Sequence, residues 1–193
     1  MTTFEEIEVT CAVCGTKSKH RVLTSTCSFG SQDLDTRPAP LERYTLELKI
    51  MECPNCHYAS DDIGEATPDI ISYLKSEDYV SVNENSAKTG MNSLAASYFK
   101  SALIKFEAEK NSDSALIKFL SAAWACDDRG DKVNADEFRL YASNILLSFS
   151  DELSLNEDMC ACLLADIYRR RGNFDNAMKV CRENESDDDT IKK

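Results

Sequence analysis

The sequence lacks the features that identify several common classes of protein. It holds only two histidines, and it contains neither a glycine-rich phosphate loop nor a paired-carboxylate motif, so no familiar catalytic centre can be recognised. No run of apolar residues approaches the roughly 20 residues that a membrane-spanning helix needs. The opening MTTFEEIEV also lacks the basic and apolar stretches of a secretory signal peptide. These absences favour a cytoplasmic protein that is not an enzyme and has no membrane partner.

Basic residues are scarce relative to acidic ones. The chain has 22 lysines and arginines against 34 aspartates and glutamates, a net charge of −12. The net charge is −5 in residues 1–66 (6 basic, 11 acidic) and −7 in residues 67–193 (16 basic, 23 acidic). Such a chain repels nucleic-acid phosphates and anionic membranes, which disfavours a nucleic-acid partner. Lys17, Lys19 and Arg21 form a local basic stretch that keeps a nucleic-acid-binding zinc ribbon as an alternative.

Nine cysteines in a cytoplasmic protein stay reduced, and they serve metal binding or catalysis more often than structural disulfides. Four of them form two Cys-x-x-Cys pairs, Cys11 with Cys14 and Cys53 with Cys56, with 38 residues between the pairs. Two intervening residues let a tight turn aim both sulfurs at one ion, and the N–H groups of the turn can donate to the thiolates. Two such turns complete a tetrahedral shell of four sulfurs. The pattern predicts a Zn²⁺ site, with a single iron ion as the alternative.

Some residues near these pairs could replace one of the four cysteines as a metal ligand. Gly15 follows Cys14, at a position where such a turn often needs a positive φ. His57 takes the matching place after Cys56, and histidine tolerates that conformation better than most residues. The alternative ligands that we keep are His57, His20 and Cys27. A site of four cysteines has no open position for water or substrate, so we expect the metal to hold a small domain together.

Alternating apolar residues predict short strands around both cysteine pairs. We expect one strand in FEEIEVTC, where Ile7 and Val9 share a face, and another in HRVLTSTC. A third is expected in RYTLELKIMEC, running into the second cysteine pair. The residues that would line one face of this third strand are Tyr44, Leu46, Leu48 and Ile50. This order of strands and turns predicts a small zinc-ribbon-like β domain over residues 1–66.

The loop between the two pairs, residues 28–43, contains a glycine and prolines that break regular structure. Asp33, Asp35 and Arg37 alternate in it, so an extended segment would direct all three to one side. One interpretation is a polar recognition site in which Arg37 contacts an anion. The other is a loop ordered by an internal Asp–Arg pair. We favour the second, because long loops in small metal domains need such ties.

From residue 67 the apolar residues take up the helical period. Thr67 and Pro68 are typical of the N-cap and first position of a helix, and a polar stretch follows at residues 83–90. Five further helices are predicted from apolar residues that recur three and four positions apart, in the ranges 94–106, 113–127, 138–149, 159–168 and 174–181. Ser154 and Glu157 are expected to form the capping box of the fourth of these helices. Gly172 is expected to end that helix and Asn173 to cap the fifth.

The segment LLADIYRRRGNFDNAMKVC resembles the helix pair of a tetratricopeptide repeat. The residues that carry the pattern are Leu164, Ala165, Tyr168, Gly172, Phe174 and Ala177, and a degenerate earlier copy is formed by Leu120, Ser121, Trp124, Gly130 and Ala135. Trp124 and Tyr168 are 44 positions apart by number, whereas a regular repeat has about 34 residues. We therefore expect a short, irregular stack of helices over residues 67–184.

The remaining features of the helical half have plain structural interpretations. The cysteines at positions 126, 160, 162 and 181 are expected to act as small apolar fillers. Arg169, Arg170 and Arg171 lie at a helix C-terminus, where cations complement the helix dipole; a clamp for an acidic ligand is the alternative. The polar residues 185–193 are predicted to form a disordered tail.

These pieces together resemble a family of bacterial proteins, the domain-of-unknown-function family 2225. The matching pieces are TCAVCG, SFGSQDLDTRP, ERYTLELKIMECPNCHYAS and the helical half. The resemblance covers most of the chain and is most specific over residues 9–60. His57 stands where such proteins more usually carry glycine. The resemblance implies a fold and a metal site but no reaction.

The predicted fold class is α+β, with a small zinc-ribbon-like β domain at residues 1–66 and an all-α, tetratricopeptide-like domain at residues 67–184. The function that fits best is a zinc-stabilised helical-repeat adaptor, which binds a protein or peptide partner and has no catalytic activity of its own. One alternative is a rubredoxin-like iron protein for electron transfer, which would be red when oxidised. The other is a zinc-ribbon regulator that binds nucleic acid.

Overall fold

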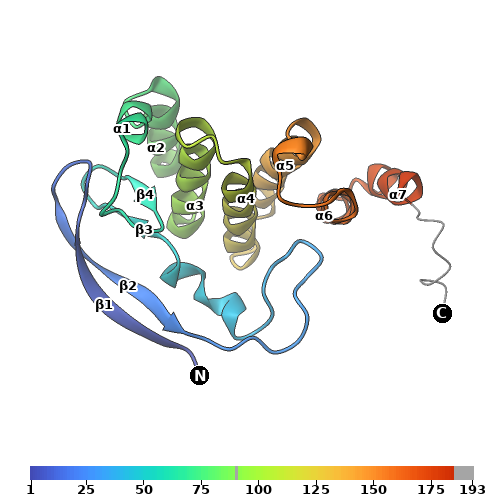
Figure 1. Ribbon diagram of the computed structural model, residues 1–193, viewed down its shortest axis with the longest axis horizontal. Helices are drawn as coiled ribbons and strands as arrows, with labels where there is room; N and C mark the ends of the chain where they lie inside the picture. Colours follow the sequence, from blue (N-terminus) through green and yellow to red (C-terminus); the bar gives the residue numbers. More distant parts are fainter. Residues whose placement is uncertain (90, 185–193) are drawn as a thin grey trace.

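The computed structural model describes residues 1–89 and 91–184. The chain begins with an antiparallel hairpin of β1 (Thr3–Thr10) and β2 (Lys17–Ser25). A long loop then leads to a second, much shorter hairpin of β3 (Met51–Glu52) and β4 (Ala59–Ser60). The rest of the described chain is helical, and Figure 1 shows the helices side by side with the long hairpin along one flank. The predicted α+β class is confirmed.

The first hairpin forms where the alternating pattern predicts it. Ile7 pairs with His20 and Val9 pairs with Ser18, so both apolar side chains lie on the same face. That face packs on a buried cluster near the cysteine pairs. The opposite face carries the exposed pairs Lys17–Glu8 and Lys19–Glu6.

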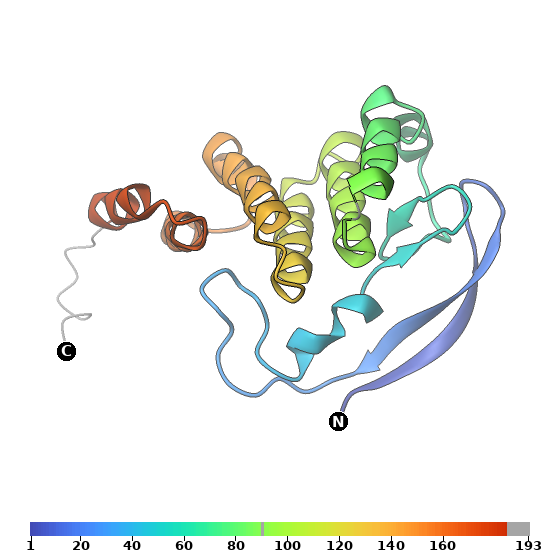
Figure 2. The same ribbon diagram turned by 180° about the vertical axis from the view of Figure 1, so that it is seen from behind.

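The third predicted strand is largely wrong. Residues Glu42–Leu48 form a 3-10 helix, η1, and only Met51 and Glu52 are paired as a strand. The hydroxyl of Tyr98 donates to the carbonyl of Leu46 at 2.8 Å, so this segment is held by a helix instead of a neighbouring strand. Tyr44 is 69% exposed, whereas Leu48 is buried, and the two do not share one buried face. Strand propensity is decided by partners. Strand β2 runs past η1 (Figure 2) but forms its ladder with β1.

The helical half contains seven α-helices within the described residues. They are α1 (Pro68–Tyr73), α2 (Glu77–Thr89), α3 (Ser93–Leu103), α4 (Ser112–Asp127), α5 (Lys132–Ser148), α6 (Glu157–Arg170) and α7 (Phe174–Glu183). A π-helical turn, Ile104–Ala108, extends α3, and a short 3-10 turn, Ser150–Glu152, follows α5. The five predicted helices correspond to α3–α7. The polar stretch at residues 83–90 belongs mostly to α2, a helix that its composition did not predict.

The predicted helix ends are confirmed at three positions and wrong at one. Thr67 accepts the N–H of Ile70, and Asn173 accepts the N–H of Asn176, as expected for N-caps. Gly172 ends α6 with φ +74°. The expected capping box at Ser154 does not form, because Asn156 caps α6. The Ser154 hydroxyl instead donates to Asp113 at 2.6 Å, which ties the start of α6 to α4.

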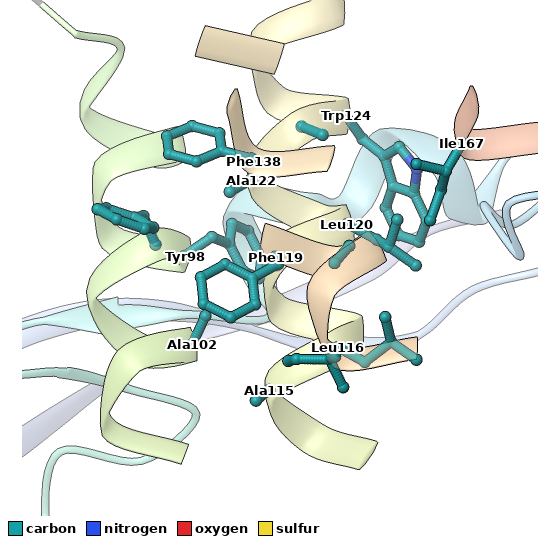
Figure 3. Close-up of a cluster of buried hydrophobic side chains, with 14 of the residues drawn as sticks. Tyr98, Ala102, Ala115, Leu116, Phe119, Leu120, Ala122, Trp124, Phe138 and Ile167 are labelled. Carbon is teal, nitrogen blue, oxygen red and sulfur yellow. The ribbon is translucent and has the colours of Figure 1, made fainter. Parts of the chain in front are cut away.

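The main core lies between α3, α4, α5 and α6 (Figure 3). Small residues let the helices approach and aromatic rings fill the space between them. Phe99 lies 4.9 Å from Phe138, centroid to centroid, and Phe119 stacks on Tyr141 at 5.1 Å. The fully or nearly fully buried residues of α4 include Ala115, Leu116, Phe119, Leu120, Ala122, Ala123, Trp124 and Cys126. Helix α4 is thus the centre of the array.

A second core crosses the boundary that we expected at residues 66 and 67. Cys11, Cys53 and Tyr58 from the strands pack with Tyr79 of α2 and with Ile104 after α3. The Tyr79 hydroxyl also donates to the carbonyl of His57 at 2.9 Å. The cysteine-bearing turns therefore share buried surface with the first helices. No described helix combines the length and the apolar composition needed to cross a bilayer.

The cysteines of the helical half differ in exposure. Cys126 is fully buried among the core residues, as a small apolar filler should be. Cys160 is partly buried and packs at the edge of the core. Cys162 and Cys181 are exposed, so the expectation is wrong for these two.

The central position of α4 leads to a test by truncation of one leucine. Leu120→Ala should lower the free energy of unfolding by about 2–5 kcal/mol, because Leu120 is fully buried and its removal leaves a cavity. Leu147→Ala makes the same chemical change on α5 at a side chain that is 58% exposed, and should cost about 0.5 kcal/mol or less. Urea unfolding measures both. Equal losses for the two variants would contradict the packing described here.

Candidate metal centre

The four cysteines of the two Cys-x-x-Cys pairs converge at the tip of the long hairpin, beside β3 and β4. Their four sulfur atoms all lie within 4.8 Å of one another. Cys11 Sγ is 3.7 Å from Cys56 Sγ, and Cys14 Sγ is 3.5 Å from Cys53 Sγ. These separations are far longer than a disulfide bond of about 2.05 Å. The cluster is therefore a set of free thiols around a common centre.

The separations between sulfurs fit a tetrahedral metal ion. With metal–sulfur bonds of about 2.3 Å, the edges of an ideal tetrahedron are about 3.8 Å long. The distances of 3.7 Å and 3.5 Å are close to this value. An ion of Zn²⁺ or iron held by four thiolates would occupy the centre and offset their mutual repulsion. The chemistry of the donor set and its geometry thus agree that Cys11, Cys14, Cys53 and Cys56 suit one metal ion.

The first cysteine turn is closed by two backbone hydrogen bonds. The N–H of Cys11 donates to the carbonyl of Thr16 at 2.9 Å, and the N–H of Gly15 donates to the carbonyl of Cys11 at 2.8 Å. Gly15 adopts φ +72°, in the left-handed region that glycine enters without strain. This confirms the conformation predicted for the position after Cys14.

The second turn repeats this arrangement with different residues. The N–H of Cys53 donates to the carbonyl of Tyr58 at 2.9 Å, and the N–H of His57 donates to the carbonyl of Cys53 at 3.0 Å. His57 adopts φ +59°, which is uncommon for a residue with a Cβ. His57 therefore serves as the left-handed residue of the turn, in the place that Gly15 takes in the first.

The protein environment affects the four thiols unequally. Hydrogen bonds from the side chains of Thr16 and Asn55 lower the pKa of Cys14 to about 5. Burial raises the pKa of Cys11, and burial also raises the pKa of Cys56 well above its usual range. Cys14 is exposed, whereas Cys11 is buried. A bound cation favours the thiolate at every ligand, so it would remove this inequality.

The other ligands considered from the sequence do not join the cluster. His57 Nδ1 lies 3.0 Å from Glu52 Oε1, and His20 Nε2 lies 2.8 Å from Ser18 Oγ. Cys27 is exposed at the far end of the first hairpin, 3.7 Å from the N-terminal nitrogen of Met1. Within residues 1–89 and 91–184, the metal-binding group contains the four predicted cysteines and none of these three residues.

Glu52, the residue before Cys53, connects the second turn to α3. Its carboxylate accepts hydrogen bonds from Lys100 Nζ and from Ser97 Oγ, both at 2.5 Å. The Lys100 side chain is only 3% exposed. The Glu52 side chain is 24% exposed, so the lysine is the buried member of this ion pair, and loss of Glu52 would leave a buried charge without its partner. This contact could not be predicted from the sequence, because nothing near Lys100 distinguishes it from an exposed helical lysine.

The loop residues Asp33, Asp35 and Arg37 contact the helices. Asp35 is fully buried and accepts the indole N–H of Trp124 at 2.9 Å. Its carboxylate also lies 3.2 Å from Arg170 Nε. Asp35 thereby joins the loop to both α4 and α6.

The two neighbours of Asp35 make further ion pairs. Arg37 Nη2 lies 2.7 Å from Asp128, and Asp33 lies 2.6 Å from Arg43 within the same segment. Burial acts to raise the pKa of Asp33, but the guanidinium groups of Arg43 and Arg170 lower it overall. The loop is thus ordered by an Asp–Arg pair of its own together with pairs to the helices.

The two basic stretches noted in the sequence are both ion-paired. Arg169 and Arg170 contact Asp166, and Arg171 contacts Asp136. On the first hairpin, the three basic residues each contact a glutamate; the pairs are Lys17–Glu8, Lys19–Glu6 and Arg21–Glu47. These acidic partners reduce the positive potential that either stretch offers to an external anion.

The unequal thiols lead to a test of reactivity and its pH dependence. After removal of metal with a chelator, iodoacetamide should label Cys14 before Cys56. The pKa of about 5 keeps Cys14 as the reactive thiolate at neutral pH, whereas the raised pKa of Cys56 keeps it protonated. Labelling of Cys14 should rise as the pH passes 5 and level off above about pH 6. Peptide mass spectrometry measures each site.

The exposed Cys162 is the internal control for this test, because it lies outside the cluster. Addition of Zn²⁺ should protect the four clustered cysteines and leave Cys162 labelled as before. Earlier labelling of Cys56 than of Cys14, or labelling of all four that Zn²⁺ does not change, would contradict the site described here.

Comparison with known proteins places these features in a family. The matching family model is described as "Uncharacterized protein conserved in bacteria (DUF2225)" and spans residues 4–188. No curated protein and no solved structure gives a match. The matched range contains both cysteine turns, the loop between them and all seven described helices. The chain therefore belongs to this family of uncharacterised bacterial proteins.

Proposed function

We propose that this protein is a zinc-stabilised helical-repeat adaptor that binds a protein or peptide partner and carries out no catalysis itself. The observation that carries the proposal is an apolar stripe on α7, the last helix. Phe174, Met178 and Cys181 follow one another at helical spacing, and all three are exposed. Ala177 and Val180, on an adjacent face, pack on the core. Helix α7 thus has one apolar face that is covered and one that is not.

Helical repeats make such a face useful for binding. Each helix pair buries one side on its neighbour, and the last pair needs a polar outer side to remain soluble alone. Figure 1 places α7 at the end of the array, farthest from the strands. A partner that lays an apolar helix or strand on the stripe would continue the array. The tetratricopeptide-like pattern of α6 and α7, with Gly172 at the turn, supports this interpretation.

The metal is proposed to have a structural role. A shell of four thiolates leaves no position for substrate or water. Cys11 and Cys53 are buried in the cluster that joins the strands to α2 and to the end of α3. Zn²⁺ at this point would hold together a strand region too small to have a core of its own. We also propose a cytoplasmic location, where the nine free thiols would stay reduced.

The ion pairs of the first hairpin favour a protein partner over a nucleic-acid partner. Lys19 is matched by Glu6 at 2.8 Å, and the neighbouring basic residues have glutamate partners too. The iron alternative has the same four ligands, so the identity of the metal decides between a structural site and an electron-transfer site.

The metal is tested by elemental analysis and an absorption spectrum of the purified protein. We expect about one zinc per chain and no visible colour. Cys53→Ser should lose the metal and loosen the packing of β3 and β4, whereas Cys162→Ser, at an exposed cysteine outside the cluster, should keep both. One iron per chain with a reversible visible band would support the electron-transfer alternative instead.

The partner surface is tested with the double variant Phe174→Glu/Met178→Glu. Both side chains are more than half exposed. The free energy of unfolding of the variant should therefore differ from that of wild type by no more than about 0.5 kcal/mol. Loss of the apolar stripe should abolish capture of a discrete partner from lysate of the source bacterium. Val133→Glu, at a residue of α5 that is 79% exposed, is the matched control and should still capture it. Capture that is equal in all three proteins would refute the role of α7.

A further inference from the structure

A small cavity lies between the segment 36–49 and the helices α3 and α4. Its volume is about 180 Å³. Leu46, Ile117 and Trp124 give it an apolar side. Trp124 is almost fully buried in the core that Figure 3 shows, with its ring directed away from Tyr98. A cavity with aromatic and aliphatic walls is suited to a ligand with an apolar body.

Four basic side chains also line the cavity. These side chains are Arg37, Arg43, Lys49 and Lys118, and each is paired with a carboxylate. Lys49 is paired at 2.7 Å with Glu42, which also lines the cavity. The whole chain has a net charge of −12. Each of these basic side chains has more N–H donors than its carboxylate partner takes up, and the remaining donors favour an anionic ligand over a neutral one.

Carboxylates outside the lining hold three of the four cationic groups in place. Arg37 is bound by Asp128 at 2.7 Å and Arg43 by Asp33 at 2.6 Å, and neither aspartate lines the cavity. Lys118 is paired with Asp61, which is also outside the lining. The basic side chains are therefore ordered before any ligand arrives, which lowers the entropy cost of binding.

Thr36, on the wall of the cavity, adds an independent observation. It adopts φ +67°, a left-handed conformation that is strained for a β-branched residue. Its hydroxyl is buried and has no hydrogen-bond partner among the described residues. Strained residues and unsatisfied buried polar groups gather at ligand sites, because the ligand supplies the missing contact.

We propose that this cavity binds a small organic anion. The oxyanion head, a carboxylate or a phosphate, contacts Lys49, Lys118 and the Thr36 hydroxyl, and an apolar or aromatic body lies against Leu46 and Ile117. The loop that carries Arg37 forms one wall, so the loop between the cysteine pairs is part of a binding site as well as a structural tie. The proposal is independent of the adaptor function, because the cavity and the stripe on α7 share no residue.

Trp124 offers a direct readout of binding. It is the one tryptophan of the chain, so its indole N–H gives a single, assigned signal in a ¹H–¹⁵N spectrum. That N–H donates to Asp35 at 2.9 Å, next to Thr36. Occupation of the cavity should shift this signal.

The experiment is a titration of the full-length protein with benzoate, phenyl phosphate and inorganic phosphate. Benzyl alcohol is the uncharged control, because it has a similar aromatic ring but no anionic group. We expect saturable shifts of the indole signal with benzoate or phenyl phosphate. Binding of inorganic phosphate and of benzyl alcohol should be at least about tenfold weaker, because each lacks one half of the recognised structure. The affinities for benzoate and for phenyl phosphate show whether the site prefers a carboxylate or a phosphate.

Two variants locate the site. Lys49→Met removes a cation of the cavity at a partly exposed side chain, and should weaken binding about tenfold or more. Lys132→Met is the control. Lys132 lines a neighbouring charged cleft that shares Arg37 and Arg43 with this cavity, but Lys132 itself does not line the cavity. The remaining signals of the spectrum report folding of each variant.

Several outcomes would overturn the proposal. One is the lack of a saturable indole shift with any of the three anions at millimolar concentration. Another is binding of benzyl alcohol as tight as that of the anions, which would show that the cations have no role. This result would come from the wild-type protein alone. A third is a loss of binding in Lys132→Met that Lys49→Met does not share, which would move the anion to the other cleft.

Discussion

The convergence of two cysteine turns on one point is the constraint on which the rest of the N-terminal half depends. The turns lie 38 residues apart in sequence, yet their sulfurs come as close as 3.5 Å. Four thiolates at this distance repel one another strongly, so a cation is needed for all of them to be ionised together. Everything between the turns must therefore form a loop with fixed ends. This explains why residues 26–41, which contain little regular structure, have a defined path.

The metal centre is integrated with the helices. Tyr79 reaches from α2 to the backbone of the second turn, and Glu52 reaches from that turn to a buried lysine of α3. Asp35 and Arg37 attach the middle of the loop to α4 and to the start of the α4–α5 connection. The strand region thus contacts the helical array through a shared core and through buried ionic contacts. A change at the cysteine cluster is positioned to affect α3, the helix that begins the main core.

Much of this arrangement could be predicted from local patterns. The Cys-x-x-Cys spacing predicted which four cysteines cluster, and the helical period predicted α3–α7, because both signals lie within short stretches of sequence. The 3-10 helix at residues 42–48 was missed because the contact from Tyr98 that stabilises it comes from a distant helix. Helix α2 was missed because its polar composition gives no apolar period. Asp35 has equally remote partners, namely Trp124 and Arg170, and no spacing rule connects these residues in the sequence.

The burial of Asp35 has a consequence for the order in which the chain assembles during translation. The N-terminal half leaves the ribosome first, and its cysteine turns can meet around a metal as soon as residue 56 is free. Asp35 then has neither of its helical partners, because Trp124 and Arg170 have yet to be synthesised. A carboxylate without partners stays in water rather than in a protein interior. The loop therefore remains open on the nascent chain and closes onto α4 and α6 only when synthesis is nearly complete, so the first segment made is among the last to reach its final position.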